Sequence, residues 1–201
     1  MKTWVITGGV ACGKSAVSKR LCEQLGAVAA HFSSDEAVHD LLEQPEIRAQ
    51  LVQKLGGQVL DSKGGIDRGW LRKRMVSDGT ARKHLEGVLH PGVFSELERL
   101  CERLRMDPRR KVLVAEVPLY YEVGTLPDAD QVIVVASSQK TQIERLRLHR
   151  GLTEAEAVAL IETQLAMMDK VALSNRVIWN DGGIDALEDQ VRLVAKDFWI
   201  S

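Results

Sequence analysis

Residues 8–15 read Gly-Gly-Val-Ala-Cys-Gly-Lys-Ser, which fits the spacing Gly-x-x-x-x-Gly-Lys-Ser. A short apolar run at residues 3–7 precedes them and suits a buried strand, while residues 16–21 are typical of a helix opening. A strand, a glycine-rich loop and a helix in this order predict a loop that binds the phosphates of a nucleoside triphosphate. The alternative is a glycine-rich turn that matches the spacing by chance, and the flanking elements argue against it.

Each residue type in this loop has a physical reason. Gly8 and Gly13 lack a Cβ, so the backbone can turn successive N–H groups toward one phosphate chain. The helix that begins near Lys14 adds its positive N-terminal end. Lys14 would reach the β- and γ-phosphates, and the Ser15 hydroxyl would hold Mg²⁺. We expect the nucleotide to contact the whole loop and the residue after it, namely Gly8, Gly9, Val10, Ala11, Cys12, Gly13, Lys14, Ser15 and Ala16.

The composition is typical of a compact enzyme. A chain of 201 residues can bury a full core and is most simply one domain with insertions. Its 27 basic and 28 acidic residues are well mixed, so the sequence gives little electrostatic support to nucleic-acid binding. No run approaches the roughly 20 apolar residues of a membrane span, and no signal-peptide pattern opens the chain. Three cysteines without metal-ligand spacing fit reduced thiols, which predicts a cytoplasmic protein.

Strands and helices alternate along the chain, which predicts an α/β fold with a doubly wound parallel sheet. We expect strands at residues 3–7, 27–32, 111–117, 131–136 and 176–179. The stretch from 34 to 110 is helical, charged and too long for a simple crossover between strands. It is therefore interpreted as an inserted substrate-binding unit.

Several helix boundaries can be predicted from local signals. Gly26 should end the helix that follows the loop, and Pro45 should break a polar helix that begins at residue 34. Thr153 and Glu156 form a capping box, which should open a helix to about residue 168. A closing helix is expected from residue 184 to residue 199.

A triphosphate loop alone does not separate a kinase from a GTP-binding switch. The switch class needs an Asn/Thr-Lys-x-Asp tetrapeptide to read guanine, and the sequence has none. Residues 61–64 read Asp-Ser-Lys-Gly and match the switch motif Asp-x-x-Gly, but they follow no credible buried strand. Their composition predicts a surface turn, so the sequence favours a kinase.

Asp35 follows the second predicted strand, at the edge where ligands of open α/β sheets collect. A carboxylate is far too weak a base to deprotonate an alcohol in advance. Asp35 would therefore align an acceptor hydroxyl and take its proton late, as suits a loose phosphoryl-transfer transition state. The alternative is a helix N-cap or first-turn acid, and the two roles are compatible.

Further segments resemble the dephospho-CoA kinase family in order and spacing. They are Leu89-His90-Pro91, the run Glu116-Val117-Pro118-Leu119-Tyr120-Tyr121-Glu122, Gln164 and Asn180-Asp181-Gly182. The resemblance implies a P-loop kinase fold with five parallel strands, an inserted helical domain and a small lid. It also implies ATP-dependent phosphorylation of the ribose 3′-hydroxyl of dephospho-CoA, the last step of coenzyme A synthesis. ATP and Mg²⁺ are the implied cofactors, and the alternative is another small-molecule or nucleotide kinase.

The resemblance also assigns residues outside the loop. His90, Pro118, Leu119 and Glu122 are expected at the acceptor substrate, with Asp35, while Asn180 and Gly182 belong to the adenine side. Each has a structural alternative. His90 could mark a helix boundary with Pro91 at a first helical position, Glu122 could anchor a bend, and Asn180 could open a turn.

Glu116 and a cluster of cations complete the expected machinery. Glu116 ends a predicted buried strand, where it would hold Mg²⁺ through water or else pair with a basic neighbour. Arg145, Arg147, His149 and Arg150 crowd one helix end. We assign Arg145 to ATP and Arg150 to catalysis, although the usual lid arginine of the family falls on His149. The alternative is a solvated basic helix end that accounts for Arg145, Arg147 or both.

Two departures from the family pattern matter. Ser33 stands in place of the first acid of the family's Asp-x-Asp, which keeps a catalytically weak ATP-binding protein as an alternative. Cys12 replaces a small Gly or Ser, and the loop amides and Lys14 could lower the pKa of its thiol. Cys12 is therefore either a modifiable thiol or a tolerated small side chain. Trp179 is expected to face the core.

The predicted organisation is one P-loop kinase domain over residues 1–201. Its core comprises residues 1–33, 111–144 and 176–201, its inserted CoA-binding helical region 34–110, and its lid 145–175. The expected partner is the small-molecule substrate dephospho-CoA, with no nucleic acid and no membrane. The chain is expected to be a monomer or a weak homo-oligomer.

Overall fold

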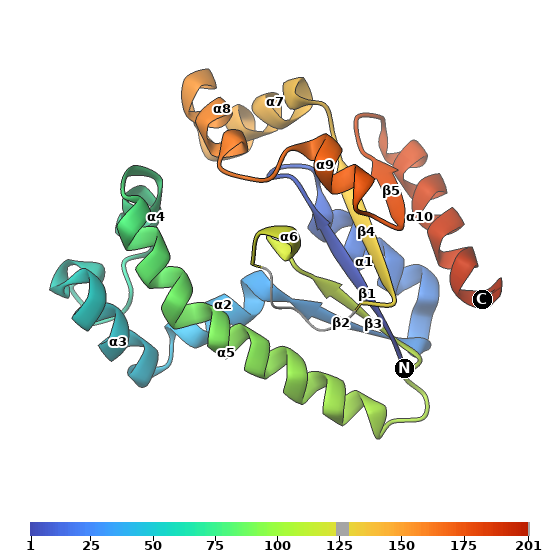
Figure 1. Cartoon of the computed structure of the whole chain (residues 1–201), viewed down its shortest axis with the longest axis horizontal. Coiled ribbons are helices and arrows are strands. Elements are labelled where there is room, and N and C mark those ends of the chain that lie inside the picture. Colours follow the sequence, from blue (N-terminus) through green and yellow to red (C-terminus); the bar gives the residue numbers. More distant parts are fainter. Residues whose placement is uncertain (124–128, 201) are drawn as a thin grey trace. The chain divides into compact units, whose positions relative to one another are not determined.

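A computed structural model of the chain describes residues 1–123 and 129–200 (Figure 1). Residues 124–128 and 201, which belong to the predicted core ranges, lie outside the described residues. The elements in chain order are β1 (Lys2–Gly8), α1 (Lys14–Leu25), η1 (Gly26–Val28), β2 (Ala29–Ser33), α2 (Ser34–Leu42), α3 (Pro45–Leu55), η2 (Gly57–Val59), α4 (Arg68–Ser77), α5 (Gly79–Arg105), β3 (Val112–Glu116), α6 (Tyr120–Val123), β4 (Gln131–Ala136), α7 (Gln139–Arg150), α8 (Glu154–Glu162), α9 (Met167–Ala172), β5 (Arg176–Trp179) and α10 (Ile184–Ile200).

The five strands form one parallel sheet in the order β2-β3-β1-β4-β5, which confirms the predicted α/β fold. Each expected strand is present, with boundaries that differ by two residues at most. The register pairs Glu116 with both Ile6 and Ser33. The carboxyl ends of β1, β2 and β3 therefore lie at one edge of the sheet, beside the phosphate loop.

The chain divides into two compact units, and the first contains residues 1–33 and 103–201. Its main core lies where α1 and α10 pack on one face of the sheet (Figure 1). Trp4 and Ile6 from β1 and Leu21 from α1 are fully buried there. Burial of each such side chain contributes about 2 kcal/mol, so this core holds the loop between β1 and α1 in place.

The second unit, Ser34–Glu102, comprises α2, α3, η2, α4 and most of α5. Its own buried side chains include Leu51, Val59 and Leu97. The sequence predicted that Pro45 breaks the helix before it. This is wrong, because α2 already ends at Leu42. Pro45 instead occupies the first turn of α3, where its missing N–H costs no helical hydrogen bond.

Pro91 lies inside α5, so the alternative that His90 marks a helix boundary is wrong. A proline in a helix interior removes one backbone hydrogen bond. Here the turns on both sides of Pro91 bury apolar side chains, among them Leu89 and Val93, and this packing offsets the loss. Gly92 contributes as well, because a Cβ at that position would lie 2.8 Å from Leu41 Cδ2.

The helix from the capping box ends earlier than predicted. Thr153 and Glu156 form the expected reciprocal hydrogen bonds, but α8 stops at Glu162 rather than near residue 168. The next two backbone N–H groups, of Thr163 and Gln164, bond three residues back to Leu160 and Ile161. This tight turn aims the Gln164 side chain at the phosphate loop, and a separate helix, α9, follows.

The segment from Asp61 to Gly64 is a surface turn, as predicted. The Gly64 N–H donates to the Asp61 carbonyl at 3.1 Å, and the four residues are exposed. Backbone N–H groups of Lys63 and Gly65 donate to the Asp61 carboxylate and lower its pKa. These hydrogen bonds of Asp61 lie within the turn itself, as expected for a surface turn.

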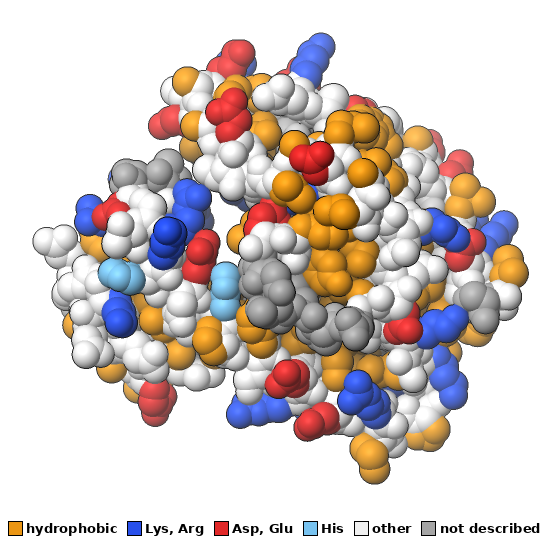
Figure 2. All heavy atoms as spheres, viewed as in Figure 1, with side chains coloured by type: hydrophobic (Ala, Val, Ile, Leu, Met, Phe, Trp, Pro, Cys, Tyr) orange, Lys and Arg blue, Asp and Glu red, His pale blue; other side chains and the backbone are white. Residues whose placement is uncertain are grey.

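Acidic and basic side chains are interspersed over the face of the molecule shown in Figure 2. This pattern agrees with the formal net charge of −1. Among the described helices, none combines the length and the apolar character needed to cross a bilayer.

Candidate functional site

The phosphate loop connects β1 to α1 and needs glycine at both of its ends. Gly8 has a φ of +140°, and a Cβ there would lie 2.1 Å from the Val135 carbonyl oxygen of β4. Gly13 has a φ of +91°, and a Cβ there would lie 2.5 Å from Asn180 Nδ2. Left-handed backbone and close approach both exclude a side chain, so the motif glycines have the roles that the spacing predicted.

Lys14 is the first residue of α1 and is 9% exposed. Its ammonium donates to the carbonyl oxygens of Gly9 at 2.9 Å and Gly8 at 3.3 Å. The side chain therefore folds back over the start of the loop. A positive charge held over backbone N–H groups at a helix N-terminus creates a site for an anion.

Glu116 is 3% exposed and accepts hydrogen bonds from two hydroxyl groups of α1. Ser15 Oγ donates to its Oε1 at 2.7 Å, and Ser18 Oγ donates to its Oε2 at 2.8 Å. His31 Nε2 lies 3.3 Å from Ser18 Oγ. The sequence left open that Glu116 pairs with a basic neighbour. Its hydrogen-bond partners are instead the hydroxyl groups of Ser15 and Ser18. Sequence reasoning missed Ser18, although its spacing of three from Ser15 puts both hydroxyls on one helix face.

Cys12 is not an activated thiol. Its side chain is fully buried, and this burial raises the pKa of the thiol, outweighing the opposing charge of Lys14. The prediction of a lowered pKa is therefore wrong, because desolvation disfavours the thiolate more than the loop stabilises it. Cys12 acts here as a small buried side chain beside Ser137.

Two side chains from other elements hold the outer side of the loop. Arg145 of α7 donates to the Ala11 carbonyl at 3.2 Å and to the Asn180 carbonyl at 2.9 Å. Asn180, which follows β5 and is 8% exposed, donates through Nδ2 to the Cys12 carbonyl at 2.8 Å. Arg145 is therefore not part of a solvated basic helix end. The predicted ATP residues Arg145 and Asn180 do meet the loop.

Trp179 does not face the core as expected. It is 43% exposed, and its indole N–H donates to Asp181 at 2.8 Å. Asp181 in turn accepts from the Ser138 N–H at 2.9 Å, which ties this turn to the N-terminus of α7. Gly182 follows on the surface, where a Cβ would lie 3.3 Å from the Ala186 Cβ.

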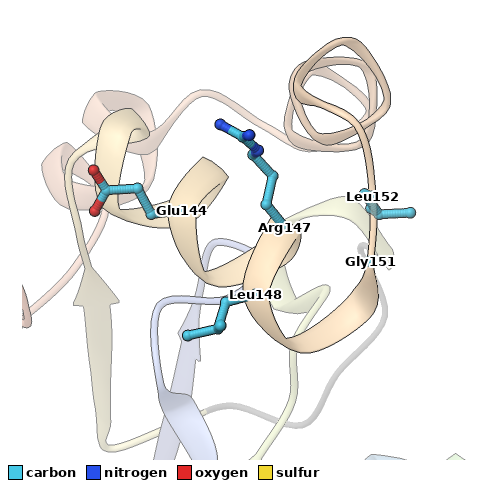
Figure 3. A pocket seen from close by; sticks show the side chains of 5 residues that line it. All are labelled: Glu144, Arg147, Leu148, Gly151 and Leu152. Carbon is cyan, nitrogen blue, oxygen red and sulfur yellow. The ribbon is translucent and has the colours of Figure 1, made fainter.

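Arg147, His149 and Arg150, the other cations of the predicted cluster, lie in the last turn of α7. Arg147 is paired with Glu154 at 3.9 Å, while His149 and Arg150 are exposed. A shallow hollow of about 470 Å³ lies beside them, lined by Glu144, Arg147, Leu148, Gly151 and Leu152 (Figure 3). Its α7 residues follow helical spacing on the side opposite to Gln142 and Arg145, which contact the loop. This hollow is therefore not the phosphate site.

Glu122 bonds to the segment around α9. Lys170 is fully buried, and its ammonium lies 2.7 Å from Glu122 Oε1. The Leu165 N–H donates to the same oxygen at 3.0 Å. Glu122 thus anchors the chain after β3, the structural role that the sequence left as an alternative. Pro118, also after β3, accepts from Thr7 Oγ1 at 3.2 Å, and Leu119 is partly buried.

Asp35 and His90 belong to the second unit. Asp35 is an exposed first-turn acid of α2, and α2 begins directly after β2. His90 is partly buried in α5, with its ring 6.0 Å from the ring of Phe94. The first-turn position of Asp35 agrees with the helix-start alternative and leaves its carboxylate on the surface.

The possible metal ligands of this site are oxygen donors from α1 and β3. In residues 1–123 and 129–200 no group of three or more His, Cys, Asp and Glu side chains is arranged around a common point. The Ser15 hydroxyl and the Glu116 carboxylate lie together at the sheet edge, and they are oxygen donors. Mg²⁺ commonly keeps several waters and takes few protein ligands, so this pair fits Mg²⁺ bound largely through water and phosphate.

The parallel sheet, the glycine-bounded loop and its lysine define a nucleotide-binding protein of the P-loop class. Two solved structures share the fold over 98% of this chain. One is TT1252 from Thermus thermophilus, with a TM-score of 0.76 at 25% identity over 97% of that chain. The other is a dephospho-CoA kinase from Campylobacter jejuni, with a TM-score of 0.70 at 22% identity over 98% of that chain.

Sequence comparison identifies the family. The family model described as dephospho-CoA kinase matches residues 3–186. A dephospho-CoA kinase from Methylococcus capsulatus is 34% identical over 92% of this chain and 91% of its own length. The chain belongs to the dephospho-CoA kinase family, and it is a kinase of coenzyme A biosynthesis that uses ATP and a small-molecule substrate.

Proposed function

We propose that Lys14, Asp35 and Arg150 carry the transfer of the terminal phosphoryl group of ATP to the ribose 3′-hydroxyl of dephospho-CoA. The products are coenzyme A and ADP. The observation that carries the proposal is the Lys14 ammonium, which is 9% exposed and folded over the Gly8 and Gly9 carbonyls at the end of β1. In that position it can exchange these carbonyls for phosphate oxygens.

The phosphates of ATP would bind the loop from Gly8 to Ala16. Backbone N–H groups on the inner side of the loop, together with the α1 N-terminus, would bind the β-phosphate. Asn180 and Gly182 would lie on the adenine side, and Arg145 would also contribute to ATP binding. Support comes from Asn180 and Arg145, which bond to the Cys12 and Ala11 carbonyls and so border the loop.

Ser15 and Glu116 would hold Mg²⁺, with Glu116 acting through water. The ion would neutralise charge on the phosphates. Ser15 Oγ lies 2.7 Å from Glu116, so the two donors already lie together. Ser33 is the register partner of Glu116 on β2, and it supplies a hydroxyl where the family pattern has a carboxylate.

Asp35 would align the 3′-hydroxyl of the acceptor and accept its proton late in the transfer. His90, Pro118, Leu119 and Glu122 would contribute to the acceptor site. The exposed carboxylate of Asp35 at the start of α2 supports this role because it remains accessible to a substrate hydroxyl. Glu122 would act through the bend that it anchors rather than as a base, since Lys170 and the Leu165 N–H already bond to it.

Residues 145–175 would form a lid and 34–110 the CoA-binding region, with the core in 1–33, 111–144 and 176–201. Arg150 lies exposed at the end of α7, next to Gly151, whose φ of +66° ends the helix. Closure would bring Arg150 to the transferred phosphoryl group and exclude water. One such arginine contributes about 10³–10⁵ in rate.

We further propose a cytoplasmic enzyme that acts as a monomer or weak homo-oligomer and binds neither nucleic acid nor membrane. Support comes from Cys12, Cys22 and Cys101, which are free thiols, and from the balanced charge of the chain.

The acceptor can be tested by measuring ADP release with dephospho-CoA, adenosine, shikimate and nucleoside monophosphates in parallel. Dephospho-CoA should be preferred clearly. Phosphorus NMR of the product should place the new phosphate on the ribose 3′ oxygen. Preference for any other acceptor in this set would overturn the proposed substrate.

Variants separate a kinase from an inactive nucleotide binder. Lys14→Ala should abolish turnover. Asp35→Asn should leave the Kd for ATP within about threefold while lowering kcat about 10²-fold or more, because it loses the proton acceptor. His149→Ala should retain far more activity than Arg150→Ala. Equal loss in the last two variants, or full activity of Asp35→Asn, would contradict these assignments.

A further inference from the structure

Val10 is held on both sides of its backbone by glutamine side chains. Its N–H donates to Gln164 Oε1 at 2.8 Å, and its carbonyl accepts from Gln142 Nε2 at 2.8 Å. Gln142 comes from α7 and is 2% exposed, while Gln164 lies in the turn between α8 and α9. The two glutamines are 132 and 154 residues from Val10 in sequence, so the contact depends on the tertiary fold.

The next two carbonyls of the loop are held from outside as well. Arg145 donates to the Ala11 carbonyl, and Asn180 donates to the Cys12 carbonyl. In a planar trans peptide the carbonyl and the following N–H point in opposite directions. A donor that fixes the Val10 carbonyl therefore also fixes the Ala11 N–H toward the other side of the loop.

The loop needs this support because its backbone is strained. Ala11 has a φ of +59°, and among the described residues it is the one non-glycine with a positive φ. An L-residue adopts left-handed backbone only at a cost in free energy, so surrounding contacts must maintain it. Packing is tight on this side, since a Cβ on Gly9 would lie 2.6 Å from both Gln142 Nε2 and Met167 Cε.

We propose that Gln142 and Gln164 are positioning residues that clamp the two peptide groups flanking Val10 and keep the loop amides aimed at the phosphates before ATP arrives. The inference rests on the proposed role of the loop in ATP binding. Gln164 also belongs to the segment 145–175 assigned to the lid, so the clamp connects that segment to the loop. Preorganisation of this kind increases affinity because less conformational freedom is lost on binding.

The two glutamines use opposite ends of their amides, which gives a matched test. Gln164 supplies an acceptor, and Gln164→Glu retains an oxygen there. Gln142 supplies a donor, and Gln142→Glu places a carboxylate oxygen against the Val10 carbonyl. Both variants add the same charge next to the backbone of the same loop residue, Val10, so charge alone predicts similar losses. The clamp predicts that Gln142→Glu binds ATP at least about tenfold more weakly than Gln164→Glu, because it leaves buried groups unpaired.

Methionine variants provide the comparison without charge. Gln164→Met removes the acceptor oxygen and should weaken ATP binding about tenfold relative to Gln164→Glu. Gln164→Glu, which keeps that oxygen, should retain the hydrogen bond to the Val10 N–H. Each full-length variant would be titrated with ATP, and KM would be measured for both substrates. KM for ATP should rise in Gln142→Glu and Gln164→Met, whereas KM for dephospho-CoA should stay within about twofold, since the proposed function gives the loop to the nucleotide and not to the acceptor.

Equal ATP affinities in the two Glu variants would overturn the clamp, as would wild-type affinity in Gln164→Met. If the variants at Gln142 fail to fold, the comparison of Gln164→Glu with Gln164→Met still decides. Lys14→Ala separates this inference from the proposed function. Retained turnover in Lys14→Ala would reject the role of the loop, whereas its loss combined with unaffected glutamine variants would reject the clamp alone.

Discussion

Ser15 Oγ donates a 2.7 Å hydrogen bond to the carboxylate of Glu116, joining the start of α1 to the end of β3 across 101 residues of sequence. Parallel pairing of β1 with β3 creates this contact, because it sets Glu116 beside Ile6, two residues before the loop. The hydrogen bond thus places a hydroxyl and a carboxylate at the proposed binding site for the terminal phosphates of ATP.

Glu116→Gln tests the metal role of this pair. The amide keeps the size of the side chain but removes its charge, so the Mg²⁺ concentration for half-maximal activity should rise about tenfold or more. Activity would be measured across a Mg²⁺ titration at saturating ATP. Ser18→Ala, which removes the other hydroxyl on Glu116, should have a smaller effect; the reverse order would contradict a metal role for Glu116.

Gly8→Ala should destabilise the protein by about 4 kcal/mol or more, because its Cβ would collide with backbone atoms that cannot rotate away. The nearest is the Val135 carbonyl oxygen, 2.1 Å away. Urea unfolding would measure the loss. Gly87→Ala is the matched control, since a Cβ there meets nothing within 4 Å and lies inside α5. It should stabilise the chain by about 0.5–1 kcal/mol.

Lys170→Ala should lower the free energy of unfolding by about 2–4 kcal/mol, because it removes the positive charge that is paired with the partly buried Glu122 carboxylate. Lys170 is fully buried and Glu122 is 21% exposed, so the effect falls toward the lower end of that range. Arg99→Ala breaks an exposed pair with Glu96 and should cost less than about 0.5 kcal/mol. Equal costs in thermal unfolding would show that burial of Lys170 is not the cause.

Cys12 should resist alkylation in the folded protein. Burial raises the pKa of its thiol, so both access and the thiolate fraction are low near neutral pH. Iodoacetamide labelling followed by mass spectrometry should modify Cys12 only after unfolding in urea. Rapid labelling of native Cys12 with loss of ATP binding would support the reactive thiol that the structure argues against.

Cys22 should make stability fall at high pH. Burial, with Glu23 adding to it, raises the pKa of this thiol from 9.0 to about 11. Between these values the unfolded chain releases its proton first, so the stability present below pH 9 is lost as the pH rises toward 11. Urea unfolding of Cys22→Ser should decline less steeply over this window than that of the wild type. If the free energies of unfolding of the two proteins fell in parallel between pH 9 and pH 11, the raised pKa of Cys22 would be contradicted.

Local sequence determined the parts of this protein that depend on neighbouring residues. The glycine spacing at Gly8 and Gly13, the stop at Gly26 and the capping box at Thr153 each act within one turn of backbone. Steric freedom and short-range hydrogen bonds decide such features, so the phosphate loop and most strand positions could be predicted. The local rules failed at Pro91, where packing along α5 outweighed a helix-breaking residue.

Tertiary structure decided which distant side chains meet the loop. Ser18 and Gln142 were not predicted as site residues. Their contacts depend on the register of β1 with β3 and on the packing of α7. The pKa of the Cys12 thiol is raised for the same reason: burial comes from surrounding elements and outweighs the nearby charge of Lys14. Sequence spacing specifies a loop able to surround phosphate, but only packing of distant elements holds that loop in its strained, binding-ready form.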